Sequence, residues 1–208
     1  AGSYASSGTY VTGLAAKNAA TELREKICAK AAQMWDVDAT EVVFDGQYVR
    51  LSDERAAREQ NRYLMLRDFA NLCVKNIAGG DALTSHASAC LPVSPPPFMA
   101  GIAEVEVDKA TGKVTVVDYA AAVDCGTVIN EALARVQAEG GIAQGIGHAL
   151  YEIVEHDERG RLRTGNFMSY KLPTRLDIGS IRVAFEPSYE PTGPFGAKSI
   201  GEVVINTP

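Results

Sequence analysis

Three stretches of the sequence combine residue types and spacings that could do chemistry, and one of them ends on Glu202. This glutamate closes a glycine-rich loop, GPFGAKSIGE, and directly precedes the apolar run Val203–Ile205. A carboxylate in such a place is partly removed from water, and desolvation raises its pKa and makes it a usable general base. We therefore take Glu202 as a candidate base; a solvated glutamate in a surface loop is the alternative.

The second stretch is VQAEGGIAQGIG, in which Gln137 and Gln144 stand seven positions apart. This spacing places both amides on one face of a helix. Glycine costs about 1 kcal/mol relative to alanine inside a helix, so four glycines here indicate a compensating close approach. We expect three of them to approach the loop 196–202: Gly140, Gly141 and Gly145. Tight helix packing with solvated glutamines is the alternative. A dinucleotide fingerprint is excluded, because the GxGxxG order is absent and no strand leads directly into the glycines.

The third stretch is the opening loop, AGSYASSGT, whose small residues leave backbone N–H groups available for an anion nest. A plain solvated loop is the alternative. Protein-ligated metal is not predicted anywhere. The three histidines lack HxH, HxxxH and HExxH spacing, and the four cysteines contain no CxxC pair.

Composition narrows the class of protein further. The chain has 208 residues, a net charge of −6 and 46% hydrophobic residues, which is ordinary for a globular protein. No basic cluster favours nucleic acid, and no segment is typical of a membrane span or a signal peptide. Widely spaced cysteines without a signal peptide favour a reducing, cytoplasmic location. The sequence begins without Met and stops at Pro208, which we interpret as a piece of a longer protein.

The elements that must position these residues follow from periodicity and turn signals. Helical spacing of apolar residues predicts helices at 13–35, 66–76 and 131–151. Alternation predicts strands at 42–44, 47–49, 103–107, 113–121, 152–155, 161–164 and 181–185. Asp45-Gly46 is typical of a tight hairpin turn with positive φ values, and Ser52-Asp53-Glu54 is a candidate helix cap, with residues 55–63 left open between helix and loop. A glycine- and proline-rich break at 79–99 separates two halves. We predict an α+β chain with two subdomains of mixed sheets and packed helices, at 1–84 and 85–208.

The sequence resembles the molybdenum-binding subunits of the xanthine dehydrogenase family, the molybdopterin hydroxylases, and is most similar to bacterial large subunits. The resemblance covers nearly the whole chain. It is carried by four runs that occur in this order: GIAEVEVDKATGKVTVVDYAAAVDCGTVIN, VQAEGGIAQGIGHALYE, NFMSYKLPTRLDI and GPFGAKSIGE. It implies a C-terminal fragment of such a subunit, with the fold of a molybdenum cofactor-binding domain.

The resemblance also implies roles for single residues. In the family, a glutamate matching Glu202 takes the proton from Mo–OH, whose oxygen attacks a purine carbon while hydride passes to Mo=S. Gln137 matches the glutamine that hydrogen-bonds the cofactor. The opening loop matches the segment beside the molybdenum and pyranopterin, with these candidate contacts: Ala1, Gly2, Ser3, and, toward the phosphates, Ser6 and Ser7. One departure is Val203, where the family commonly has proline. This difference weakens the inference that the loop has the family's geometry, but it does not affect the assignment of Glu202 as the acid.

Cofactors and partners follow from the same resemblance. It implies molybdopterin with molybdenum, in many bacteria as the cytosine dinucleotide, with Fe–S clusters and FAD on other domains or subunits. The partners would be the rest of the subunit, the Fe–S and FAD components, and a small heteroaromatic substrate such as xanthine or hypoxanthine in purine catabolism. The fragment alone is expected to be inactive, because family motifs that complete the site lie outside it. The alternatives are a same-family hydroxylase for an aldehyde, nicotinate or an aromatic thioester, or a non-catalytic structural domain.

Overall fold

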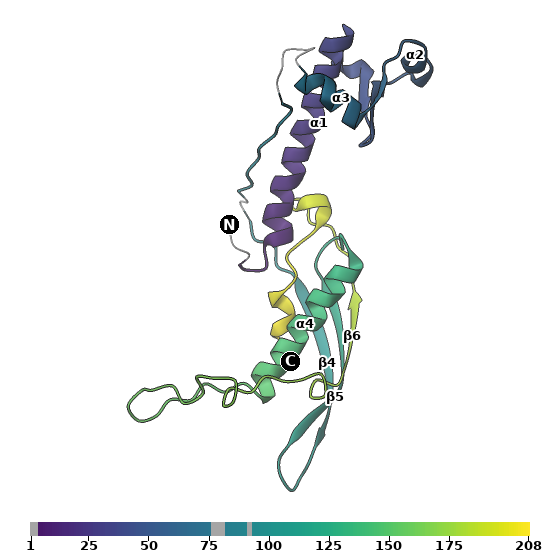
Figure 1. The fold of residues 1–208 in the computed structure, drawn as a ribbon. Coiled ribbons are helices and arrows are strands. Elements are labelled where there is room, and N and C mark those ends of the chain that lie inside the picture. The colour runs from purple at the N-terminus through teal and green to yellow at the C-terminus, as the bar shows by residue number, and fades with distance from the viewer. Residues whose placement is uncertain (1–3, 76–81, 91–92) are drawn as a thin grey trace. The chain divides into compact units, whose positions relative to one another are not determined.

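The computed structural model describes residues 4–75, 82–90 and 93–208 and divides the chain into two compact units (Figure 1). One unit is Leu14–Ala89; the other combines Ala1–Gly13 with Cys90–Pro208. The opening segment therefore groups with the second half of the chain. Tyr10 explains this grouping, because its buried ring places the hydroxyl 2.6 Å from Thr192 Oγ1. The division into subdomains 1–84 and 85–208 remains a prediction for the intact protein.

The unit Leu14–Ala89 packs helices on a small antiparallel sheet. Its strands run in the order β1 (Val42–Phe44), β2 (Tyr48–Leu51) and β3 (Tyr63–Met65). Its helices are α1 (Gly13–Trp35), α2 (Glu54–Glu59) and α3 (Leu66–Val74), with a 3-10 turn at Ala39–Glu41. The core is Ile27, Ala31, Ala32, Val42, Val49, Phe69 and Cys73. The bounds predicted for the first helix are confirmed, and Asp53 caps α2 by accepting hydrogen bonds from the N–H groups of Arg55 and Ala56.

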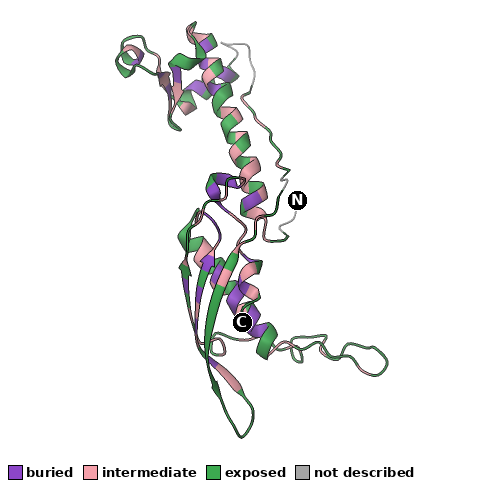
Figure 2. Ribbon diagram, turned by 180° about the vertical axis from the view of Figure 1, so that it is seen from behind, coloured by how far each residue is buried: buried purple, intermediate pink, exposed green. Residues whose placement is uncertain are grey.

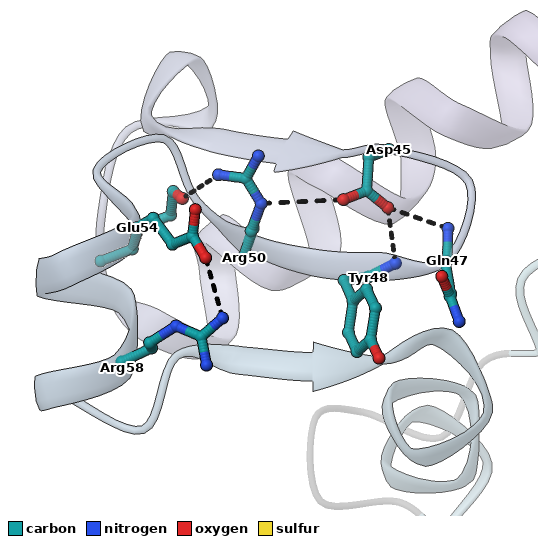
Figure 3. A network of polar contacts seen from close by, with 7 residues as sticks. Asp45, Gln47, Tyr48, Arg50, Glu54 and Arg58 are labelled. Carbon is teal, nitrogen blue, oxygen red and sulfur yellow. Dashed lines mark hydrogen bonds and ion pairs between the residues drawn. The ribbon is translucent and has the colours of Figure 1, made fainter.

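The hairpin between β1 and β2 forms at Asp45-Gly46, as predicted, but with a different turn geometry (Figure 3). Only Gly46 takes a positive φ, at 98°. The Asp45 carboxylate instead closes the turn by accepting hydrogen bonds from the backbone N–H groups of Gln47 and Tyr48, at 2.9 and 2.7 Å. The hydrogen bond from Tyr48, followed by that from Gln47, lowers the pKa of Asp45. The turn is thus stabilised by a side chain as well as by backbone conformation.

The second unit is built on a mixed sheet in the order β4 (Phe98–Val107), β5 (Val114–Asp124) and β6 (Ser180–Phe185). β4 and β5 are antiparallel, whereas β5 and β6 are parallel. Helix α4 (Glu131–Leu150) lies between β5 and β6 in the chain and packs its buried residues on the sheet. The core is Val116, Tyr119, Ala121, Val123, Cys125, Ala138, Ile142, Ile146, Val183 and Val204. The predicted α+β class with mixed sheets is confirmed.

Two predictions about strands need correction in this unit. β4 is exposed along nearly all of its length instead of burying one face (Figure 2), whereas buried residues alternate along the neighbouring strand β5. The strands predicted at 152–155 and 161–164 are reduced to one bridge, His156–Leu162, around a turn at 157–160. An isolated two-stranded hairpin with exposed apolar residues has no buried face to stabilise it.

No helix among the described residues is both long and apolar enough to cross a bilayer.

Candidate functional site

The loop that carries Glu202 is tied to the end of β5 by backbone contacts. The N–H of Lys198 donates to the carbonyl of Cys125 at 2.8 Å, and the N–H of Thr127 donates to the carbonyl of Gly196 at 2.9 Å. Gly126 and Ala197 form an isolated antiparallel bridge between these bonds. A Cβ on Gly126 would lie 2.3 Å from the Gly196 carbonyl oxygen, so this close approach requires glycine. Residues 196–198 therefore lie antiparallel to residues 125–127 and are joined to them by this bridge.

The residues next to this backbone bridge, Lys198 and Asp124, form an ion pair. Lys198 Nζ is 2.8 Å from Asp124 Oδ2, and the two side chains are only 10% and 21% exposed. The other carboxylate oxygen accepts hydrogen bonds from Ser188 Oγ at 2.7 Å and from the Gly126 N–H at 2.9 Å. Burial acts to raise the pKa of Asp124, but the hydrogen bonds from Lys198, Ser188 and Gly126 together hold it below its ordinary value.

Farther along the loop, Glu202 meets two distant parts of the chain. Its backbone N–H donates to Ser6 Oγ at 2.8 Å. A Cβ on the buried Gly201 would lie 2.6 Å from Ser6 Oγ and 2.9 Å from Gln137 Nε2. The opening loop, helix α4 and the loop 193–202 therefore converge at one point. Of the predicted site residues, Glu202, Gln137 and Ser6 are brought together here.

Two cavities meet at this point. The larger has a volume of about 530 Å³ and extends toward the start of α4 and the end of β5; the smaller, of about 320 Å³, extends along α4 toward Gln144. Ser6, Gln137, Gly201 and Glu202 line both. The Glu202 side chain is exposed, so the partial desolvation expected from its flanking apolar residues is not present in this chain. The apolar residues after it turn into a 3-10 helix, Glu202–Ile205, and only Val204 is buried.

The other predicted contacts of the opening loop do not all reach this site. Ser7 donates its hydroxyl to the backbone carbonyl of Tyr4 at 2.8 Å and does not line either cavity. Ala1, Gly2 and Ser3 lie outside the described residues. Sequence reasoning missed Asn130, which caps α4 by accepting the N–H of Leu133 at 3.1 Å and lines the larger cavity. Its place directly before the helical pattern was the signal that could have identified it.

The predicted close approach of the α4 glycines to the loop 196–202 is found for Gly141. It is found in part for Gly145 and not for Gly140. A Cβ on Gly141 would lie 3.0 Å from the Gly201 carbonyl oxygen and 2.2 Å from Val204 Cγ2. A Cβ on Gly145 would lie 2.6 Å from the Ile205 carbonyl oxygen, just beyond the loop. The prediction is wrong for Gly140, whose Cβ position has no described atom within 4 Å. Successive helical residues point about 100° apart, which turns Gly140 away from the contact.

The donor set at this site consists of amide, hydroxyl and carboxylate groups and does not resemble a metal-ligand cluster. Within the part of the chain that the structure describes, no three His, Cys, Asp or Glu side chains gather closely enough to hold a metal ion. Cys125 lines the larger cavity, but burial raises the pKa of its thiol and keeps it neutral. These amide, hydroxyl and carboxylate groups therefore suit an organic group held by hydrogen bonds.

Comparison with known proteins gives a consistent picture. The family model of the molybdopterin cofactor-binding domain matches residues 1–179. The chain is 36% identical over 206 residues to the probable hypoxanthine oxidase XdhD of Escherichia coli strain K12, covering 99% of this chain and 21% of that protein. It is 33% identical over 205 residues to the putative xanthine dehydrogenase molybdenum-binding subunit XdhA of the same strain, covering 98% of this chain and 27% of that protein.

A solved structure shows the same fold. The crystal structure of the Cu,Mo-CO dehydrogenase matches 98% of this chain and 25% of that chain, with a TM-score of 0.82 and 25% sequence identity. The chain thus spans about a fifth to a quarter of the length of these relatives. The family model ends before Glu202, but the match to XdhD covers 99% of the chain.

Proposed function

The chain belongs to the molybdopterin cofactor-binding domain family, and from this premise we propose that it is part of a xanthine dehydrogenase-type molybdenum hydroxylase. The substrate would be a purine such as xanthine or hypoxanthine, in line with the names of the relatives at 36% and 33% identity. One observation carries the proposal. Ser6 and Glu202, separated by 196 positions, are joined by a hydrogen bond next to Gln137 and line the same cavities.

The fit of the cofactor is supported by the groups around Gly201. Because Gly201 lacks a Cβ, the Gln137 amide and the Ser6 hydroxyl stand close to the backbone of the loop. Amide and hydroxyl groups both donate and accept hydrogen bonds, as a pterin and its phosphate require. We propose that Gln137 and Ser6 hold the cofactor. Four further contacts of the opening loop remain predictions: Ala1, Gly2, Ser3 and Ser7.

The proposed chemistry divides between the cofactor and Glu202. The molybdenum cofactor, when bound, supplies the oxidising power and makes water acidic enough to be deprotonated near neutral pH. Glu202 would accept that proton as the general base, because Glu202 lines the cavity and its backbone N–H is held by Ser6. Overall, a purine C–H bond and one water would give C–OH, two protons and two electrons.

Those electrons require components beyond this chain. We propose that Fe–S clusters and FAD on other domains or subunits carry them away, that the rest of the molybdenum subunit completes the site, and that the enzyme is cytoplasmic. The cofactor would be molybdopterin, with the cytosine dinucleotide as the form expected for many bacteria. XdhA, described as a molybdenum-binding subunit, supports an assembly of this kind.

The proposed function is tested on the intact protein that contains this chain. Metal analysis should find stoichiometric molybdenum, and xanthine or hypoxanthine should be hydroxylated faster than an aldehyde or nicotinate assayed in parallel. Faster turnover of the aldehyde or nicotinate would leave the family assignment in place and overturn the purine assignment. Absence of molybdenum from protein produced with an adequate molybdenum supply would favour a structural domain.

The chain by itself is expected to bind no molybdenum and to turn over no purine. A cofactor held between parts of a subunit loses most of its affinity when one part is missing, because the remaining groups are no longer preorganised. The measurement is metal analysis of purified residues 1–208 next to the intact protein from the same cells. Stoichiometric molybdenum in the purified chain would contradict the expectation.

Replacing Gln137 by alanine in the intact protein should lower the cofactor content before it lowers the turnover per bound molybdenum. The change removes a hydrogen bond worth about 0.5–1.5 kcal/mol, or roughly 2- to 13-fold in affinity. Gln47→Ala is the matched control, since Gln47 is exposed in the β1–β2 hairpin and lines neither cavity. Equal molybdenum-to-protein ratios in the two variants would argue against a cofactor contact at Gln137.

A further inference from the structure

The loop that carries Glu202 is attached to the sheet through one mostly buried charge pair, Lys198–Asp124. The pair joins the last residue of β5 to a residue four positions before Glu202. Between Lys198 and Glu202 the chain forms no regular secondary structure, so the position of Glu202 depends on how residues 196–198 are held.

Three kinds of contact hold this attachment, and they share the same two residues. Each Asp124 carboxylate oxygen has a donor: Lys198 Nζ on one, and Ser188 Oγ with the Gly126 N–H on the other. The Lys198 backbone N–H continues the bridge by donating to the Cys125 carbonyl. Lys198 Nζ also lies 5.5 Å from the centre of the Phe98 ring, on the neighbouring strand β4. A shift of the loop would therefore break the ion pair and the bridge together.

Even a partly buried ion pair such as this one is a poor source of net stability, because the desolvation of its charges offsets much of their attraction. Its directional hydrogen bonds nevertheless allow only one arrangement of the two segments, which two apolar side chains would not enforce. From this geometry we propose that Lys198 and Asp124 are positioning residues, which hold Gly201 and Glu202 in register with Ser6 and Gln137. The effect of this pair on catalysis rests on the proposed function. Its structural role in holding the loop does not.

Arg182 and Asp118 offer a matched control in the same sheet. They form an ion pair between β6 and β5, but the Arg182 side chain is 70% exposed and lies outside both cavities. Lys198→Met and Arg182→Met remove the same charge from the same unit. The first should change the loop, whereas the second should not.

The direct measurement is amide hydrogen exchange in the intact protein. Lys198→Met should speed exchange of the backbone amides of residues 127, 198 and 202 by about tenfold or more, because a local opening of the loop becomes easier. Exchange at Ile142, in the core of α4, should stay unchanged and so shows that the fold is intact. Adding Asp124→Asn to Lys198→Met should restore part of the protection, since no unpaired charge is left buried. Lys198→Arg, which keeps the charge, should stay closer to wild type.

Unchanged exchange in the loop, or equal changes in Lys198→Met and Arg182→Met, would overturn the proposal. If Lys198→Met does not fold, Asp124→Asn is measured in its place, because it removes the other charge of the pair. A change confined to residues 125–127 and 196–202 supports positioning, and either no change or a change spread through the unit contradicts it. Lys198→Met should also lower kcat per bound molybdenum more than it changes KM. Hydrogen exchange is measured without an activity assay, so it tests the positioning role separately from the proposed function. Unchanged loop exchange in an enzyme that hydroxylates purine would overturn only the positioning role of Lys198 and Asp124. Altered exchange in a protein without molybdenum overturns the proposed function alone.

Discussion

Replacing Glu202 by glutamine in the intact enzyme is expected to abolish purine turnover while leaving the molybdenum content near that of the wild type. Glutamine has almost the same shape as glutamate, but its amide cannot accept the proton that the reaction releases. Loss of a positioned base lowers rates by about 10²- to 10⁴-fold. Because the backbone N–H of residue 202, not its side chain, donates to Ser6, the loop should keep its place. The measurement is kcat per bound molybdenum.

Glu158→Gln is the control for the change of charge, because Glu158 is exposed in the turn 157–160 and lines neither cavity. It should behave like the wild type in both turnover and metal content. Turnover of Glu202→Gln within about tenfold of wild type would show that another group acts as the base. Loss of molybdenum from Glu202→Gln would instead indicate a role in binding.

Replacing Gly141 by valine is expected to displace the Glu202 loop and to reduce cofactor loading in the intact enzyme. The added Cβ would lie 2.2 Å from Val204 Cγ2 and 3.0 Å from the Gly201 carbonyl oxygen, and Val204 is fully buried. Overpacking of this kind costs about 1–3 kcal/mol, so the unfolding temperature should fall as well. Molybdenum content and a thermal melt measure the two effects.

Gly140→Val makes the same chemical change one position earlier, where the new Cβ meets no described atom within 4 Å. It alters helix propensity to the same extent, but Gly140 lines the smaller cavity, so it is the difference in melting temperature that reports the contact with the loop. Equal melting temperatures for the two variants would show that the approach of Gly141 to the loop has no consequence for stability.

The helices of this protein could be predicted because their signals are local. α1 and α4 follow the helical spacing of their apolar residues, and Asp53 and Asn130 stand directly before the helices that they cap. The strands were harder, because pairing depends on distant residues. β5 and β6 pair in parallel because the chain crosses over through α4 between them. The sequences of the two strands do not show where that helix packs.

The amino-acid sequence by itself determined the helices α1, α3 and α4, the α+β class, the tight turn at Asp45-Gly46 and, through family motifs, Glu202 and Gln137 as candidate site residues. Only the tertiary structure decided that Ser6, and not Ser7, meets Glu202, and that Gly141, and not Gly140, faces the loop. It also revealed the Lys198–Asp124 pair, whose partners stand 74 positions apart. The physical reason is that local signals reflect the conformations of neighbouring residues, whereas a contact between distant segments depends on how every intervening element packs.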